Sequence, residues 1–82
     1  MSFSYEFINK DYNSQLFECS LLVVSILLKQ YKANIINITD FKTHTKNKIS
    51  YIFNNIDIIK DTMEKITIKN IINECIQITN AH

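Results

Sequence analysis

The sequence predicts an all-α fold, a small helical bundle of three principal helices with a short N-terminal extended segment. Over most of the chain, apolar residues recur at spacings of three and four, as they do along one side of a helix. The chain has no glycine and no proline, so turns that require a positive φ would fall on asparagine, and tight hairpins are disfavoured. Because it has 82 residues, we expect a single domain over residues 1–82 with a small core.

The N-terminal residues follow a two-residue period instead. Phe3, Tyr5 and Phe7 alternate with polar side chains, which indicates a short extended segment. Residues 9–13 are polar and typical of a turn. The three aromatic side chains need cover, so we expect the segment to lie across the bundle.

The first helix is predicted to run from a cap at Ser14 to about Ala33, with Asn34 ending it in place of a glycine. It is apolar on two neighbouring sides, one formed by Leu16, Ser20, Val23 and Leu27 and the next by Phe17, Leu21, Val24, Leu28 and Tyr31. A surface helix needs only one apolar stripe. This helix is therefore either the centre of the bundle, covered by the other elements, or half of an interface with a second subunit or a partner.

A second helix is predicted from Thr39, its N-cap, with Asp40 in the first turn. Apolar residues then recur at alternating spacings of three and four, which predicts a seam of the coiled-coil type. The seam consists of Ile49, Ile52, Ile56, Ile59, Met63 and Ile66, and Phe53 widens it. Asp61 and Lys65 are expected to form an ion pair on the exposed side of this helix.

A third helix is predicted over residues 68–79, with Thr67 as its N-cap. At 100° per residue, its apolar residues fill one arc of roughly 160°. The residues of this arc are Ile68, Ile71, Ile72, Cys75, Ile76, Ile78 and Thr79. Polar residues fill the remainder, so the helix must dock its apolar side on another element.

Several kinds of functional site are excluded by the composition. Phosphate-binding loops of the P-loop and dinucleotide types need glycine, which the chain lacks. The candidate metal ligands are far apart in the sequence: Cys19, His44, Cys75 and His82. We therefore expect no metal site and no cofactor. Asp57 and Asp61 are expected to be solvated rather than an acid–base dyad, because nothing nearby would desolvate them, and the chain is expected not to be an enzyme.

The same residues predict the cellular setting. The chain opens with neither a basic segment nor an apolar signal core, so export is not expected. The most apolar run, residues 16–28, is shorter than the roughly 20 residues of a membrane span and is interrupted by polar side chains. Two cysteines at apolar helix positions are expected to remain reduced. We expect a soluble cytoplasmic protein without membrane contact, in the host cytoplasm if the gene is viral.

One candidate contact surface is a cluster of lysines near the start of the second helix. Lys42, Lys46 and Lys48 flank His44, and no acidic residue follows Asp40 until late in the helix. Cations at a helix start oppose the helix dipole, so helix stability does not explain them. A contact with phosphate or with an acidic protein surface would explain them; the alternative is a solvated cluster in a lysine-rich sequence.

A second candidate surface is a stripe outside the predicted seam. His44, Tyr51 and Ile58 recur at seven-residue spacing and would share one side of the second helix. One interpretation is a partner-binding stripe, because interfaces favour aromatic anchors. The other is packing beneath the N-terminal segment. The sequence leaves both interpretations open.

A nucleic-acid interpretation divides the second helix into a helix-turn-helix. Residues 40–44 would form its first helix, residues 45–47 the turn and residues 48–55 the recognition helix, with Ser50, Tyr51, Asn54 and Asn55 facing base edges. The seam continues past this segment without a break, no glycine occupies the turn, and the net charge is only +1. The absence of arginine also removes the commonest specific contact with guanine. Nucleic acid is therefore not the favoured partner.

The favoured function is that of a small, intracellular, non-enzymatic protein that binds and modulates another macromolecule, either a protein or a protein–nucleic acid complex. Isoleucine, asparagine and lysine, whose codons are A/T-rich, supply 35 of the 82 residues. Small size and this bias suggest an inhibitor encoded by a phage or mobile element, for example an anti-CRISPR or other anti-defence protein. The alternatives are a helix-turn-helix DNA-binding regulator and a structural homodimer, the latter of which would explain the doubly apolar first helix.

Overall fold

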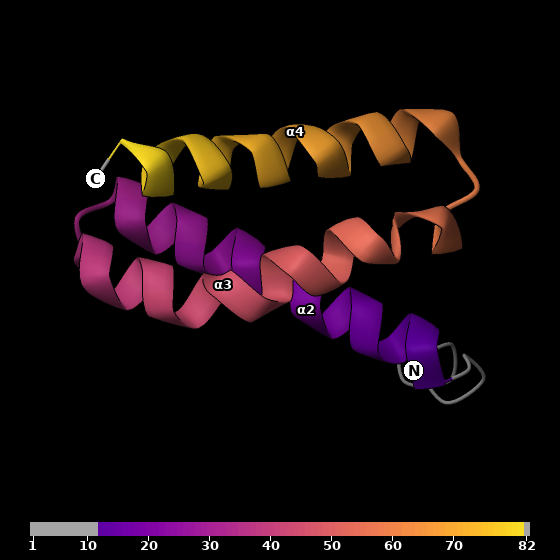
Figure 1. Cartoon of the computed structure of the whole chain (residues 1–82), viewed down its shortest axis with the longest axis horizontal. Helices are drawn as coiled ribbons and strands as arrows, with labels where there is room; N and C mark the ends of the chain where they lie inside the picture. Colours follow the sequence, from indigo (N-terminus) through magenta and orange to yellow (C-terminus); the bar gives the residue numbers. More distant parts are fainter. Residues whose placement is uncertain (1–11, 82) are drawn as a thin grey trace.

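A computed structural model describes residues 12–81, and the extended segment predicted at the N-terminus lies outside them. Three α-helices and a short 3-10 turn make up the described range: α2 (Tyr12–Lys32), α3 (Ile38–Asn54), η1 (Ile56–Ile58) and α4 (Thr62–Asn80). No strand occurs in these residues, which confirms the prediction of an all-α bundle of three principal helices. α2 crosses behind α3, and α4 lies alongside α3 (Figure 1). The contact between α2 and α3 is the most extensive, and that between α2 and α4 is the smallest.

The end of α2 is formed as the sequence predicts. Asn34 has a φ of 63° and is the one residue in the described range with a positive φ. Its N–H donates to the carbonyl of Tyr31 at 3.0 Å, and the N–H of Ile35 donates to the carbonyl of Gln30 at 2.8 Å. This pair of bonds is a Schellman motif, which asparagine accommodates here in place of glycine. The start differs, because α2 already begins at Tyr12 and Ser14 lies within its first turn.

The start of α3 corrects the predicted cap. The side chain of Asn37 accepts a hydrogen bond from the N–H of Asp40 at 2.8 Å, so Asn37 is the N-cap and Thr39 is already helical. A cap side chain bonds the amide two or three positions ahead of it, and Asn37 is the residue that reaches this amide.

The predicted long second helix is wrong, because α3 ends at Asn54. Asn55 ends the helix: its side-chain amide donates to the carbonyl of Tyr51 at 2.8 Å, and its N–H donates to the carbonyls of Tyr51 and Ile52. The chain then makes the 3-10 turn η1 and starts α4 at Thr62. The residues of the supposed seam are thus divided among α3, the turn at residues 55–61 and α4, and α3 and α4 lie side by side (Figure 1).

The start of α4 also differs from the predicted one. Asp61 is its N-cap, with a carboxylate oxygen that accepts from the N–H of Glu64 at 3.0 Å. Thr67, the predicted cap, lies inside the helix and its hydroxyl donates to the carbonyl of Met63 at 3.0 Å. Because Asp61 caps the helix, Lys65 pairs instead with Asp57, at 3.1 Å between Nζ and Oδ1. The Asp57 side chain is 92% exposed, so this pair adds little stability.

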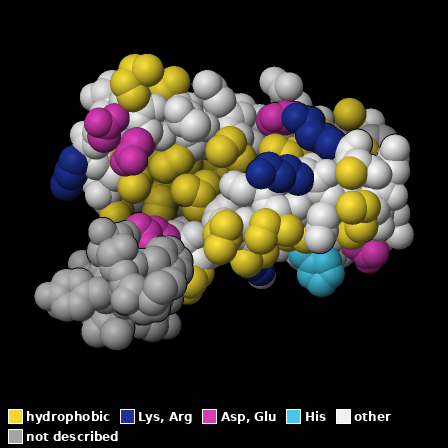
Figure 2. All heavy atoms as spheres, turned by 180° about the vertical axis from the view of Figure 1, so that it is seen from behind, with side chains coloured by type: hydrophobic (Ala, Val, Ile, Leu, Met, Phe, Trp, Pro, Cys, Tyr) yellow, Lys and Arg dark blue, Asp and Glu magenta, His cyan; other side chains and the backbone are white. Residues whose placement is uncertain are grey.

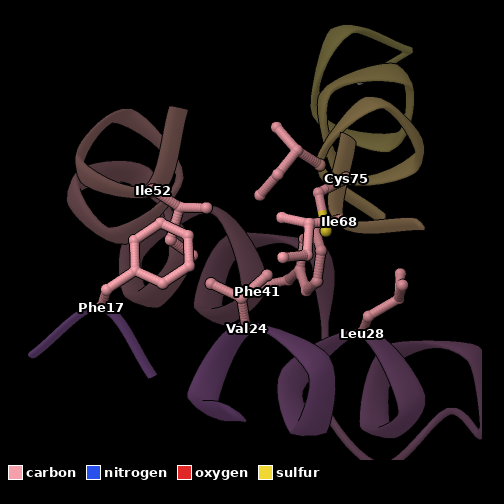
Figure 3. Close-up of a cluster of buried hydrophobic side chains, with 8 residues drawn as sticks. Phe17, Val24, Leu28, Phe41, Ile52, Ile68 and Cys75 are labelled. Atoms are coloured by element: carbon pink, nitrogen blue, oxygen red, sulfur yellow. The ribbon is translucent and has the colours of Figure 1, made fainter. Parts of the chain in front are cut away.

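The core forms where the three helices converge (Figure 3). Its fully or almost fully buried residues are Phe17, Val24 and Leu28 of α2, Phe41 and Ile52 of α3, and Ile68, Ile72 and Cys75 of α4. The rings of Tyr31 and Phe41 lie 5.1 Å apart between centroids. Thr45 is buried beside them, and its hydroxyl donates to the Phe41 carbonyl at 2.7 Å. All members of the apolar arc predicted for the last helix are buried or half-buried.

The two cysteines are both free and differ in their surroundings, which predicts a difference in reactivity. Burial raises the pKa of the Cys75 thiol to about 11; Glu74 adds to this and Lys32 opposes it. Since the thiolate is the reactive form, we expect a thiol reagent at pH 8 to label only the exposed Cys19 in the native protein and both cysteines after unfolding. The pKa of the same thiol in the unfolded chain is the ordinary value of 9.0, below the value of about 11 in the folded protein. The contribution of Cys75 to folding stability is therefore complete below pH 9 and is lost as the pH rises towards 11. Rapid native labelling of Cys75 would contradict its burial.

Candidate partner-binding surfaces

The structure separates the predicted lysine cluster into two parts. Lys42 and Lys46 lie one turn apart on α3 and line a hollow between α3 and α4. Lys48 does not line this hollow. At 100° per residue it lies on the other flank of α3, close to the side of His44. The three lysines therefore do not form one patch, and only two of them border an apolar surface.

We refer to this surface as the α3–α4 groove. It consists of two adjoining hollows of about 260 Å³ each, which share Ile49 and Ile76. The first is lined by Lys42, Thr45, Lys46, Ile49, Ile76 and Thr79. The second is lined by Ile49, Ser50, Phe53, Asn54 and Ile76. The groove thus has an apolar floor, with lysines at one end and an aromatic ring at the other.

Phe53 is the residue of this groove whose exposure sequence reasoning missed. The sequence predicts that it widens the seam, but it is 56% exposed and lies one residue before the end of α3. A signal was present in the sequence. Lys42, Lys46, Ile49 and Phe53 recur at i, i+4, i+7 and i+11, which places them on one side of a helix.

The predicted stripe of His44, Tyr51 and Ile58 does not lie on one helix. Ile58 belongs to η1, so the seven-residue spacing that joined it to α3 has no helical meaning. Tyr51 and Ile58 are half-buried and pack against the core, and the Tyr51 hydroxyl donates to the carbonyl of Asn13 at 3.4 Å. His44 is exposed. The geometry favours a packing role for Tyr51 and Ile58, and their predicted contact with a partner stays a prediction.

The helix-turn-helix division of this segment is contradicted by the continuity of α3. Residues 45–47, the supposed turn, lie in the middle of α3. Thr45 is fully buried there, and a turn at this point would expose it. The two separate helices that the motif needs are therefore not formed by these residues.

A further hollow lies between α2 and α4. It measures about 390 Å³ and is lined by Phe17, Glu18, Leu21, Ile59, Met63, Glu64, Thr67 and Ile68. Figure 2 shows it as a recess floored by hydrophobic side chains, with acidic side chains at its edges. It forms because α2 and α4 are the pair of helices in least contact.

Among the described residues, no three His, Cys, Asp or Glu side chains are grouped so that they could hold a metal ion. Nor is any helix in this range long and apolar enough to span a membrane. Comparisons of the chain with protein-family models, with curated proteins and with solved structures found no match. The functional proposal therefore depends on the surfaces of the bundle alone.

Proposed function

We propose that this chain is a small non-enzymatic protein that binds and modulates another protein, and that the α3–α4 groove is its binding surface. The observation that carries the proposal is the combination of an exposed aromatic ring, Phe53, with an isoleucine floor and two lysines, Lys42 and Lys46. Aromatic side chains next to shallow apolar pockets are the usual anchors of protein interfaces.

The charge of α3 defines the kind of partner. The helix contains Asp40 and three lysines, two of them on the groove. An amphipathic helix or strand that has acidic residues beside its apolar ones would complement this surface. The apolar contacts would supply most of the affinity, while the lysines would mainly increase the association rate and fix the orientation of the bound segment.

A role as an inhibitor encoded by a phage or mobile element rests on size and codon-biased composition. Such a protein acts by occupying a surface that its target needs, and no catalytic group of its own is required. The target can be a protein–nucleic acid complex, in which case the groove contacts the protein component. The DNA-binding alternative draws no support from this segment, because α3 is continuous through the supposed turn.

The test compares capture of partners by the wild-type chain with capture by a groove variant, Lys46→Glu with Phe53→Ala. We expect the captured protein to bind the variant roughly thirtyfold more weakly, which corresponds to about 2 kcal/mol. Stability should change little, because exposed substitutions cost about 0.5 kcal/mol or less each. Affinity is measured by titration calorimetry and stability by thermal melts.

The matched control is Lys48→Glu with Ile66→Ala, which makes the same charge change and removes an exposed apolar side chain outside the groove. It should bind the partner as the wild type does. Equal affinity of the groove variant and the wild type would refute the groove as the binding surface. Nuclease treatment run in parallel separates the alternatives, since loss of all captured partners would indicate binding to nucleic acid rather than to protein.

A further inference from the structure

The outer side of α2 is an apolar surface that the rest of the described chain does not cover. The core-facing stripe of α2 contains Phe17, Val24 and Leu28. On the other side, the exposed residues are Leu16, Cys19, Leu22, Val23 and Ile26, with Leu22 at 60% exposure and Ile26 at 45%. Hydrophobic side chains gather on this face of the molecule in Figure 2, next to the recess between α2 and α4.

The spacing of these residues is that of a helix pair. Leu16, Cys19, Val23 and Ile26 follow one another at intervals of three, four and three, which is an a/d pattern. Residues 19–28 form a run of ten without an acidic or basic side chain. A second helix packed here would therefore bury no charge at the centre of the contact.

The charges of α2 indicate what that second helix is. The acidic and basic residues of α2 are Glu18 near its start and Lys29 and Lys32 near its end. Glu18 lies five residues before Val23, and Lys29 lies five residues after Val24. At 100° per residue, Glu18 and Lys29 are only about 20° apart around the helix. An antiparallel copy of α2 would thus place its Lys29 beside Glu18, and its Glu18 beside Lys29. In a parallel twofold pair the same flank of the two helices would lie on opposite sides of the contact, so Glu18 and Lys29 would not face each other.

We propose that the protein forms a twofold symmetric homodimer through α2, in which two copies of this helix pack antiparallel about an axis that passes close to Val23. The surface is self-complementary in both apolar pattern and charge, as a twofold interface requires. A contact made largely by one helix from each subunit is smaller than the roughly 800 Å² per partner of a standard interface, so we expect micromolar dissociation. It shares no residue with the α3–α4 groove, so the dimer would present two such grooves.

The first experiment measures mass against concentration by sedimentation equilibrium. The wild-type mass should rise from 9.7 kDa towards twice that value through the micromolar range. Ile26→Lys should weaken dimerisation at least about a hundredfold, because each subunit would then bury one ammonium group in the contact. Ile66→Lys is the matched control, since Ile66 is 48% exposed on α4, and it should dimerise normally.

The second experiment tests the antiparallel register and does not depend on an apolar substitution. Glu18→Lys and Lys29→Glu, each alone, place like charges opposite one another and should weaken the dimer roughly three- to tenfold at low salt. The double variant Glu18→Lys with Lys29→Glu restores opposite charges and should recover the wild-type dissociation constant. Absence of recovery would overturn the antiparallel arrangement.

A third readout uses a cysteine close to the twofold axis. With Cys19 replaced by serine, Val23→Cys should form a disulfide-linked dimer under mild oxidation, since the two copies of residue 23 come close at the axis. Wild-type Cys19 should not form such a disulfide, because the antiparallel arrangement separates the two copies of Cys19 along the helix axis. A chain that remains monomeric at all concentrations would overturn the proposal. If Ile26→Lys then also lowered the melting temperature strongly, the outer side of α2 would be covered by residues 1–11 of the same chain.

Discussion

Replacing Phe41 with alanine is expected to cost about 3–5 kcal/mol of folding free energy, the range for truncation of a buried phenylalanine. Phe41 is fully buried, and its ring lies against that of Tyr31 at 5.1 Å between centroids. The cavity would open at the contact between α2 and α3, the most extensive in the bundle. A domain of this size has a total stability of about 4–12 kcal/mol. The variant should therefore lose at least about a quarter of the total stability, and a wild-type stability near the lower bound would leave it largely unfolded.

Urea unfolding followed by circular dichroism measures this loss. Phe53→Ala provides the control, because it removes the same ring from the same helix at a position that is 56% exposed. It should lose about 0.5 kcal/mol or less. Equal losses in the two variants would show that the burial of Phe41 does not hold the bundle together.

The double variant Tyr51→Ala with Ile58→Ala is expected to lose about 2–4 kcal/mol, since two half-buried side chains are truncated at once. Both side chains pack against the core, and Tyr51 also links α3 to the start of α2 through its bond to Asn13. That bond is long at 3.4 Å, so most of the loss should come from packing. Thermal melts should show a fall of about 10 °C or more, as about 1 kcal/mol corresponds to 4–8 °C in a domain of this length.

His44→Ala serves as the comparison for the same predicted stripe. His44 is exposed, so its removal should leave the melting temperature nearly unchanged. If instead the double variant kept its stability but lost affinity for a captured protein, the partner-binding interpretation of Tyr51 and Ile58 would be correct. The same melts, repeated after deletion of residues 1–8, would measure any stability contributed by the N-terminal segment.

Much of the local structure could be predicted because it depends on neighbouring residues. Asn34 was expected to end the first helix, since asparagine is, after glycine, the residue that best tolerates a positive φ. The apolar arc of the last helix was expected to be buried, because its spacing admits one docking side. The N-cap of α3 was misplaced by two residues, because Thr39 and Asn37 are both suitable caps. The N-cap of α4 was misplaced because Asp61 was expected inside the second helix.

The break between α3 and α4 was missed for a different reason. Ile52, Ile56, Ile59 and Met63 keep helical spacing across it, so periodicity alone cannot distinguish one long helix from two shorter ones. The packing of the last helix against the core distinguishes the two arrangements. A continuous helix would carry Ile68 and Ile72 away from α2, whereas a turn at residues 55–61 folds them back onto the core.

The candidate site depended on the same break. The sequence placed Lys42, Lys46 and Lys48 together because they are close along the chain, but helical geometry puts Lys48 on another flank. Once α4 folds back beside α3, its Ile76 completes a groove with Lys42, Lys46 and Phe53, and this pairing involves residues more than twenty positions apart. Spacing within one helix could predict the residues that α3 contributes to the groove, but not those that α4 contributes.

By itself, the sequence determined the helical class, the number of principal helices and the end of the first, since these follow from local periodicity and from the lack of glycine and proline. Only the tertiary structure decided which residues of the two predicted stripes of α2 are buried. α3 and α4 cover Phe17, Val24 and Leu28 of the second stripe. In the first stripe Ser20 is buried as well, whereas Leu16 and Val23 stay exposed. Two helices cannot enclose a third, so the outer side of α2 stays exposed. A chain of this length has no further element in the described range that could cover it.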